Sequence, residues 1–222
     1  APARGHAVTA LVAEALGSGA TNVEVLAFLE DAAHAGGTAL AIARALPLYR
    51  AKTAAAGAAD EDKPREVSVH FFGADGAAIT DEPRLAAFCD HASDAVRRAA
   101  RLVDLPPELM QTDHFVQEAR DAASRCEALG RKVAVEVIQG DELREGGFGG
   151  IFNVGKCAAL PPALVVLSYT PAGADPSTAV ALVGKGIRYD TGGLSLKSKD
   201  GMPGMKSDCG GAAALLSAFE AA

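Results

Sequence analysis

Residues 163–187, with the sequence ALVVLSYTPAGADPSTAVALVGKGI, decide the fold class of this chain. They contain two apolar runs, at 163–169 and 178–187, which are separated by a turn rich in Pro, Gly and Asp. Strands that are covered on both faces of a sheet show nearly continuous apolar runs of this kind. We therefore expect two buried strands here.

Helical and extended patterns alternate on either side of this stretch. We expect a helix over 112–129 with Thr112 as its N-cap, and then a strand over 132–138. A Gly-rich loop at 145–150 and a last helix from Gly210 onward complete the pattern. Helices that alternate with buried strands make an α/β domain. We place this domain over residues 104–222, with a mixed, largely buried sheet.

The first hundred residues predict a separate N-terminal α/β domain over residues 1–80, followed by a linker helix. The spacing of apolar residues indicates helices at 5–17, at 21–34, where Thr21 or Asn22 would be the cap, and at 38–45. Small and charged residues indicate a surface loop at 51–65. Alternating Val and Phe indicate a strand at 66–72. A long apolar stripe over residues 81–103 predicts the linker helix, which Pro106 and Pro107 bring to an end.

The composition limits the classes of protein. The chain has 222 residues, 49% of them apolar and 22% charged, and a formal net charge of −7, so it has enough apolar residues to form a core and is not a disordered chain. The acidic balance argues against a nucleic-acid partner, and no apolar run reaches the roughly 18 residues of a membrane span. Four scattered cysteines, Cys89, Cys126, Cys157 and Cys209, form no disulfide framework or zinc-finger pattern and indicate a reducing compartment.

A phosphate-binding loop is one site that a local pattern suggests and its context opposes. Residues 150–157 match GxxxxGK, with Cys157 where Ser or Thr normally binds Mg²⁺. Such a loop follows a buried strand and opens a helix, whereas Pro161 and Pro162 leave no room for a long helix here. We interpret the segment as a Gly-rich turn, and a nucleotide-binding protein is the weakest interpretation of the chain.

Residues 183–211 carry the strongest chemical signal. Lys185 ends an apolar run between two glycines, and Asp190 precedes Thr-Gly-Gly. The spacing Lys-x4-Asp-x6-Lys-x10-Asp adds Lys197 and Asp208. Two carboxylates and two lysines at strand ends suit hard divalent cations and an anionic transition state. Each residue alone has a plainer explanation, namely a turn, a solvated lysine, or a cap of the last helix.

With these motifs, the chain resembles the leucyl aminopeptidase (M17) family, and in particular its probable aminopeptidase-like branch. The resemblance is carried by VGKGIRYDTGGLSLK with GMPGMKSDCGGAAA, and further upstream by LVDLPPELMQTDHF and GGFGGIFNVGKCAALPPALVVLSYTP. It extends from about Arg101 to the end of the chain and more weakly over the first segment. On this basis residues 104–222 are expected to be the N-terminal part of the catalytic domain.

The resemblance implies a two-metal aminopeptidase that hydrolyses the N-terminal residue of peptides with a metal-bridging water. Lys185, as a neutral amine, and Asp208 would each bind metal, and Asp190 would bridge the two ions. Lys197 would be the catalytic cation that polarises the scissile carbonyl. The implied cofactors are two Zn²⁺ or Mn²⁺ ions, with Mg²⁺ as a further option. The implied partners are peptides with a free N-terminus and other copies in a homohexamer, in the cytoplasm, with a mitochondrial address left open.

The chain also departs from the family pattern. The family adds an Asp, a Glu and an Arg within Asn-Thr-Asp-Ala-Glu-Gly-Arg, which is absent here, so two dications would face only two carboxylates. Glu108 stands where the family usually has Asn, and Cys209, which we expect to be a buried small residue, replaces a common Met. The helical pattern runs to the last residue, so we expect a truncated chain that is inactive as given. The alternative is an inactive scaffold or assembly subunit of the same fold.

Overall fold

The computed structural model describes residues 2–17, 21–49, 66–79 and 83–222. The chain divides into two compact units, residues 1–101 and 102–222, and the division falls within one long helix. Helices and strands alternate in both units, so the predicted α/β class is confirmed. The predicted domain limits at residues 80 and 103 stay predictions.

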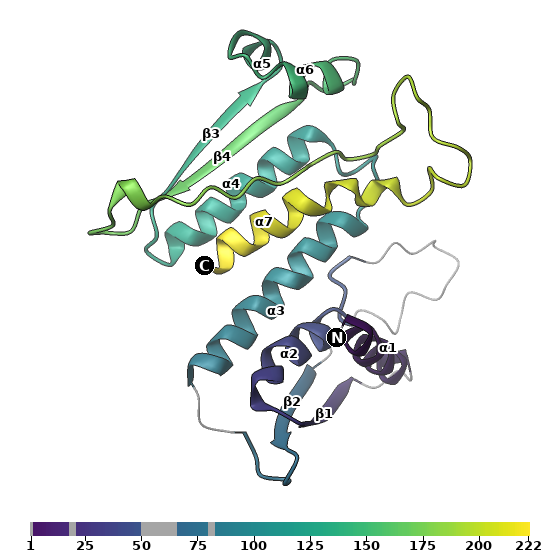
Figure 1. Ribbon diagram of the computed structural model, residues 1–222, viewed down its shortest axis with the longest axis vertical. Helices are drawn as coiled ribbons and strands as arrows, with labels where there is room; N and C mark the ends of the chain where they lie inside the picture. Colours follow the sequence, from purple (N-terminus) through teal and green to yellow (C-terminus); the bar gives the residue numbers. More distant parts are fainter. Residues whose placement is uncertain (1, 18–20, 50–65, 80–82) are drawn as a thin grey trace. The chain divides into compact units, whose positions relative to one another are not determined.

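The first unit packs two helices on one face of a two-stranded parallel sheet (Figure 1). Its elements are α1 (Pro2–Gly17), β1 (Asn22–Leu29), a 3-10 turn (Ala32–His34), α2 (Ala35–Ala43), β2 (Glu66–Gly73) and α3 (Pro83–Asp104) up to Arg101. The core consists of Val12, Leu16, Ile42 and Ala45, with Val23, Val25, Val67 and Val69 packed against it. The strands pair from Asn22 opposite Glu66 to Leu29 opposite Gly73.

The predicted helix at 21–34 is wrong, because most of that range forms strand β1. Val23 and Val25 are two residues apart, which is the period of a strand, and burial alternates along β1 accordingly. Leu26 and Phe28 lie on the other face, where they are 57% and 66% exposed. A cap at Thr21 or Asn22 is excluded with the helix. The predicted surface loop at 51–65 lies outside the described residues.

The second unit packs helix α4 against an antiparallel pair of strands, and helix α7 against α4 (Figure 1). Its elements are α4 (Thr112–Ala128), β3 (Val133–Gln139), α5 (Asp141–Glu145), α6 (Gly149–Gly155), β4 (Ala163–Tyr169), two 3-10 turns (Pro176–Thr178 and Met205–Cys209) and α7 (Gly210–Ala221). The core between α4 and the two strands consists of Ala123, Cys126 and Val133, with Val135, Leu167 and Phe219 packed against it.

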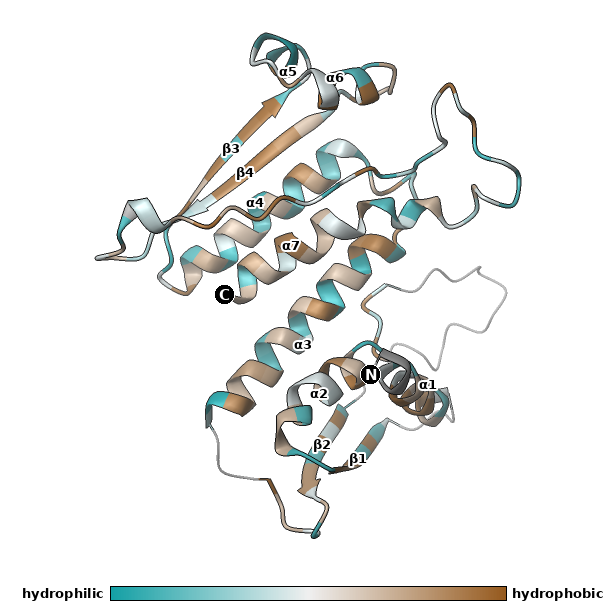
Figure 2. Ribbon diagram, in the orientation of Figure 1, coloured by the Kyte–Doolittle hydropathy of each residue, from teal (hydrophilic) through white to brown (hydrophobic). Residues whose placement is uncertain are grey.

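The predicted strand at 178–187 is wrong, because residues 179–187 form neither strand nor helix. A strand exists only through hydrogen bonds to a neighbour, and no described residue pairs with this segment as a strand. Its apolar side chains are therefore open to solvent, with Val180 83% and Val183 91% exposed. Figure 2 shows brown, hydrophobic stretches along this extended part of the chain. β4 is likewise only partly covered, rather than buried on both faces.

Smaller features also differ from expectation. Gln111 occupies the N-cap of α4 without a side-chain hydrogen bond, so Thr112 is the first helical residue rather than the cap. The Gly-rich loop at 145–150 contains the end of α5 and the start of α6. The GxxxxGK segment lies mostly in α6, which has seven residues. Among the described helices, none has the length and apolar character needed to cross a bilayer.

Candidate functional site

The structure brings the four residues of the Lys-Asp-Lys-Asp motif into two ion pairs. The Nζ atom of Lys185 lies 2.7 Å from Oδ2 of Asp208, and the Nζ atom of Lys197 lies 3.2 Å from Oδ2 of Asp190. All four belong to the second unit and lie in the loop between β4 and α7. The side chains of Asp208, Lys197 and Asp190 are 23–31% exposed, whereas that of Lys185 is 59% exposed.

A tight turn holds Asp190 and Lys197 together. The backbone N–H of Gly192 donates to Oδ1 of Asp190 at 2.8 Å, and that of Lys197 donates to the carbonyl of Thr191 at 2.9 Å. Gly192 has a φ of +87°, a left-handed conformation that side chains rarely adopt. A Cβ atom there would collide with the carbonyl oxygen of Ser195. The Thr-Gly-Gly sequence is thus what lets Lys197 fold back onto Asp190.

The Lys185–Asp208 pair is held by the start of α7. The backbone N–H of Ala212, in the first turn of α7, donates to the carbonyl of Lys185 at 2.9 Å. Gly184 allows this approach, because a Cβ atom there would lie 2.6 Å from Cα of Ala212. Asp208 lies on the 3-10 turn Met205–Cys209 and does not cap α7 through its side chain.

One backbone contact connects the two pairs. The N–H of Asp190 donates to the carbonyl of Met205, three residues before Asp208, at 3.4 Å. The backbone of Asp190 is therefore linked to the short turn that carries Asp208. Both pairs are built on loops, and these loops depend on a few specific hydrogen bonds for their shape.

The surroundings favour the charged forms of two of these groups. The pKa of Asp190 is lowered, first because its carboxylate accepts the N–H of Gly192 and then because Lys197 donates to it. The pKa of Lys185 is raised, chiefly because its ammonium donates to Asp208. Lys185 is therefore an ammonium in the chain as described, and the neutral amine of our expectation would need a cation to displace its proton.

The donors fit a divalent cation in kind but not in number. Two carboxylates and an amine nitrogen are ligands that Zn²⁺ and Mn²⁺ accept. Within the described residues, however, no group of three or more His, Cys, Asp or Glu side chains is placed to hold an ion. Lys185, Asp190 and Asp208 alone therefore offer fewer ligands than such an ion normally takes.

Two basic residues that the motif spacing did not single out help to hold this region. Nη1 of Arg188 donates to the carbonyl of Pro107 at 2.7 Å and to Oε1 of Gln111 at 2.6 Å. Nζ of Lys206 donates to the backbone carbonyls of Val103 and Asp104 at 3.0 and 2.6 Å. Their partners lie about eighty to a hundred residues earlier in the chain, so local sequence carries no signal for them.

Cys209 is fully buried, as expected for a small packing residue. Its Sγ atom donates to the carbonyl of Lys206 at 3.3 Å, and burial raises the pKa of its thiol. Cys209 therefore helps to close the 3-10 turn through the hydrogen bond of its buried thiol.

Residues 97–222 match the catalytic domain of the cytosol aminopeptidase family, Peptidase M17, and the chain belongs to that family. Among its relatives is the "Probable aminopeptidase NPEPL1" of Homo sapiens, which is 44% identical over the whole chain. "Leucine aminopeptidase 1" of Caenorhabditis elegans is 48% identical over 61% of the chain. The chain spans 40% of the length of the human protein and 26% of the nematode protein.

Solved structures show the same architecture. The leucyl aminopeptidase of Trypanosoma brucei in complex with bestatin matches with a TM-score of 0.78 and 40% identity, over 99% of this chain and 40% of that one. The leucine aminopeptidase of Caenorhabditis elegans matches with a TM-score of 0.72 and 37% identity, over 90% and 37% of the two chains. The bottromycin maturation enzyme BotP in complex with Mn matches with a TM-score of 0.68 and 28% identity, over 98% and 44%.

Proposed function

We propose that this chain is part of a metal-dependent aminopeptidase that removes the N-terminal residue of peptides by a two-metal mechanism. The observation that carries the proposal is the meeting of Lys185 with Asp208 and of Lys197 with Asp190 at the spacing of the leucyl aminopeptidase motif. Membership of the M17 family supports it, as does the bestatin complex of the trypanosome relative.

In this proposal Lys185, Asp190 and Asp208 hold two divalent ions, and Zn²⁺ or Mn²⁺ are the ions that suit these donors. The Mn complex of BotP supports Mn²⁺ as a candidate. When bound, the two ions supply an activated water and an anchor for the free amine of the substrate. A requirement for that free amine would restrict the enzyme to the ends of peptides.

The residues of the chain supply charge and position. Hydrogen bonds from Gly192 and Lys197 lower the pKa of Asp190, so they reinforce the ionised form that a metal ligand needs. Lys197 is a cation held beside that carboxylate, with its side chain 29% exposed. From there its ammonium can donate to the scissile carbonyl as negative charge develops on the oxygen. We propose Lys197 as the catalytic residue and the other three as ligands.

The 222 residues alone supply an incomplete site. Two carboxylates balance about half the charge of two dications, and a divalent ion normally has at least about four ligands. We therefore propose that the remaining donors lie outside these residues, and that the 222-residue chain by itself does not hydrolyse peptides. We also propose that the complete protein is a cytoplasmic homohexamer, which light scattering and fractionation can test.

An inactive scaffold of the same fold is the second candidate. It is favoured by one observation: each lysine of the motif already neutralises a carboxylate, so the four residues could act as purely structural ion pairs. Metal content separates the two functions, because the enzyme needs about two divalent ions per chain and the scaffold needs none.

The experiment that tests the proposal changes Asp190 in the protein at its full natural length. Asp190→Ala should abolish hydrolysis of leucine amide and lower the bound Mn²⁺ measured by mass spectrometry of metals. Asp200→Ala, which removes an exposed carboxylate from the same loop, is the matched control and should change neither. Turnover and metal content of Asp190→Ala close to those of the control would refute the site assignment.

A further inference from the structure

Lys206 joins the loop of the two ion pairs to the end of α3. Its Nζ atom donates to the carbonyl of Val103 at 3.0 Å and to that of Asp104 at 2.6 Å. These are the last two residues of α3, whose carbonyls have no N–H group four residues further along the helix. A cation is favourable at this position because the C-terminus of a helix carries partial negative charge.

The place of Lys206 in the chain gives this contact its importance. It is the second residue of the 3-10 turn Met205–Cys209. On one side, the carbonyl of Met205 accepts the N–H of Asp190, and on the other Asp208 pairs with Lys185. The carbonyl of Lys206 itself accepts the thiol of the buried Cys209. The turn therefore contains Asp208 and accepts a hydrogen bond from the backbone of Asp190, and Lys206 anchors it at its second residue.

The chain before this turn contains little regular structure. Apart from the 3-10 turn Pro176–Thr178, residues 170–204 contain neither helix nor strand, and in Figure 1 they form a long extended loop before α7. A loop of this length has many conformations, so each specific anchor removes a large share of them. Lys206 is suited to the task because its three ammonium donors can serve two carbonyls and the residue is half-buried.

We propose that Lys206 is a positioning residue that sets the distance between Asp190 and Asp208 by fastening the turn Met205–Cys209 to the end of α3. Lys206 lies outside the ligand set. It acts on Asp190 through the carbonyl of Met205, and on Asp208 because both residues belong to the same turn. This inference rests on the proposed function, because a fixed spacing of the carboxylates matters for binding two ions. Residues that orient metal ligands typically change metal affinity or activity by about 10- to 100-fold when they are replaced.

The test uses the protein at its full natural length with three single variants. Lys206→Met keeps the stem and removes the donors, and Lys206→Arg keeps a cation that can donate to both carbonyls. Lys199→Met removes an exposed lysine from the same loop and is the matched control. For each we would measure kcat and KM for leucine amide, Mn²⁺ affinity by calorimetry, and the rate of Cys209 alkylation in metal-free protein by peptide mass spectrometry.

We expect Lys206→Met to lower kcat and Mn²⁺ affinity by about tenfold or more, with KM within about twofold of the parent. Lys206→Arg should recover most of both losses. Alkylation of Cys209 should accelerate several-fold in Lys206→Met and return toward the parental rate in Lys206→Arg, because the thiol is fully buried only while the turn is closed. Lys199→Met should match the parent in all three measurements.

Two results would overturn the proposal. One is a Lys206→Met protein whose kcat, Mn²⁺ affinity and Cys209 alkylation all match Lys199→Met, and the other is a loss that Lys206→Arg does not recover. If Lys206→Met does not fold, Lys206→Gln, which keeps an amide donor, replaces it under the same criteria. If the parent itself does not hydrolyse leucine amide, the proposed function fails, while the alkylation rates still decide whether Lys206 fastens the turn.

Discussion

Gly192 is the backbone position on which the Asp190–Lys197 pair depends. With φ at +87°, an added Cβ would collide with the carbonyl oxygen of Ser195 and lie 3.0 Å from the backbone nitrogen of Lys197. Gly192→Ala should therefore open the turn, lower the free energy of unfolding by about 2 kcal/mol or more, and lower kcat for leucine amide. Urea unfolding and steady-state kinetics of the full-length protein measure the two effects.

Gly193 provides the control for this change. It also has a positive φ, of +65°, but a Cβ there would meet nothing within 4 Å. Gly193→Ala should lower the free energy of unfolding by only about 1 kcal/mol, the conformational cost of the backbone, and should keep the kcat of the parent. Equal losses of stability and kcat in the two variants would mean that backbone strain alone, rather than the clash with the turn, explains the effect.

Arg188 holds the segment between α3 and α4 to the loop that carries Asp190. Replacing it by Met removes two short hydrogen bonds, to the carbonyl of Pro107 and the side chain of Gln111, and leaves their acceptors unsatisfied in a half-buried place. We expect a loss of about 1–3 kcal/mol in the free energy of unfolding. Arg120→Met, on the exposed face of α4, should stay within about 0.5 kcal/mol of the parent. Indistinguishable urea midpoints of the two variants would exclude this role.

Local sequence patterns predict most elements of this chain, and the two failures have identifiable causes. The ranges of α3, α4, β2, β3 and β4 agree with expectation to within two residues, because each has a clear apolar pattern: a helical stripe, an alternation or a continuous run. In β1 the apolar residues fit a helical spacing as well as the two-residue period of a strand, so the local pattern does not separate the two. At 178–187 the composition is that of a strand, but a strand also needs a partner, and sequence composition cannot supply one.

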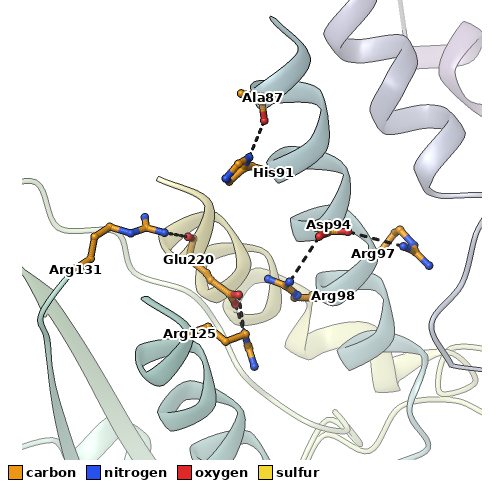
Figure 3. A network of polar contacts seen from close by, with 8 residues as sticks. All are labelled: Ala87, His91, Asp94, Arg97, Arg98, Arg125, Arg131 and Glu220. Carbon is orange, nitrogen blue, oxygen red and sulfur yellow. Dashed lines mark hydrogen bonds and ion pairs between the residues drawn. The ribbon is translucent and has the colours of Figure 1, made fainter. Parts of the chain in front are cut away.

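An ion pair joins the ends of α4 and α7, and its contribution to the free energy of unfolding can be measured. Figure 3 shows Arg125 and Arg131 converging on Glu220. Nε and Nη2 of Arg125 donate to the two carboxylate oxygens of Glu220 at 2.7 and 2.9 Å, and Nη2 of Arg131 donates to its backbone carbonyl at 3.0 Å. The side chain of Glu220 is 8% exposed and that of Arg125 is 42% exposed, so the bidentate pair is only partly screened by water.

Glu220→Gln should weaken the packing of α7 on α4. It removes the charge from the bidentate pair, and we expect a loss of about 1–2 kcal/mol, which is smaller than for a fully buried pair because Arg125 is partly solvated. Asp141→Asn breaks the exposed pair with Arg144 and should cost no more than about 0.5 kcal/mol. Thermal unfolding of the full-length variants gives both values. Equal melting temperatures for the two variants would show that the pair at α7 contributes no more than a surface pair.

Within α3, polar side chains make contacts with residues three or four positions away on the same helix. Figure 3 shows Asp94 between Arg97 and Arg98, at 3.8 and 3.7 Å, and Nδ1 of His91 at 2.8 Å from the carbonyl of Ala87. These are neighbours three or four residues apart, the spacing at which helical side chains meet. Each such exposed pair contributes only a few tenths of a kcal/mol, so this surface stabilises α3 locally.

At the scale of the whole molecule, the sequence predicts which charged residues of the candidate site come together better than it predicts the contacts that hold their loops. The motif spacing named Lys185, Asp190, Lys197 and Asp208, and the structure places them in two pairs. The residues that hold these loops in place cannot be predicted in the same way. Lys206, for example, contacts residues about a hundred positions earlier, and these contacts depend on how the whole unit folds. Whether the four residues bind metal stays a prediction for the experiments on the full-length protein.

The exposed apolar residues of 179–187 predict how a preparation of the 222 residues alone behaves. Val180, Leu182 and Val183 are 83%, 64% and 91% exposed and lie on extended backbone that no described strand pairs with. Such a segment is a template for pairing with another copy, so we expect concentration-dependent self-association in sedimentation velocity. Val183→Lys should shift the protein toward monomer, because a charge in the segment opposes pairing with an identical one. Val154→Lys places the same charge on α6, where Val154 is 70% exposed, and should leave the association unchanged. A monomeric parent, or equal effects of the two lysines, would show that this segment does not drive the association.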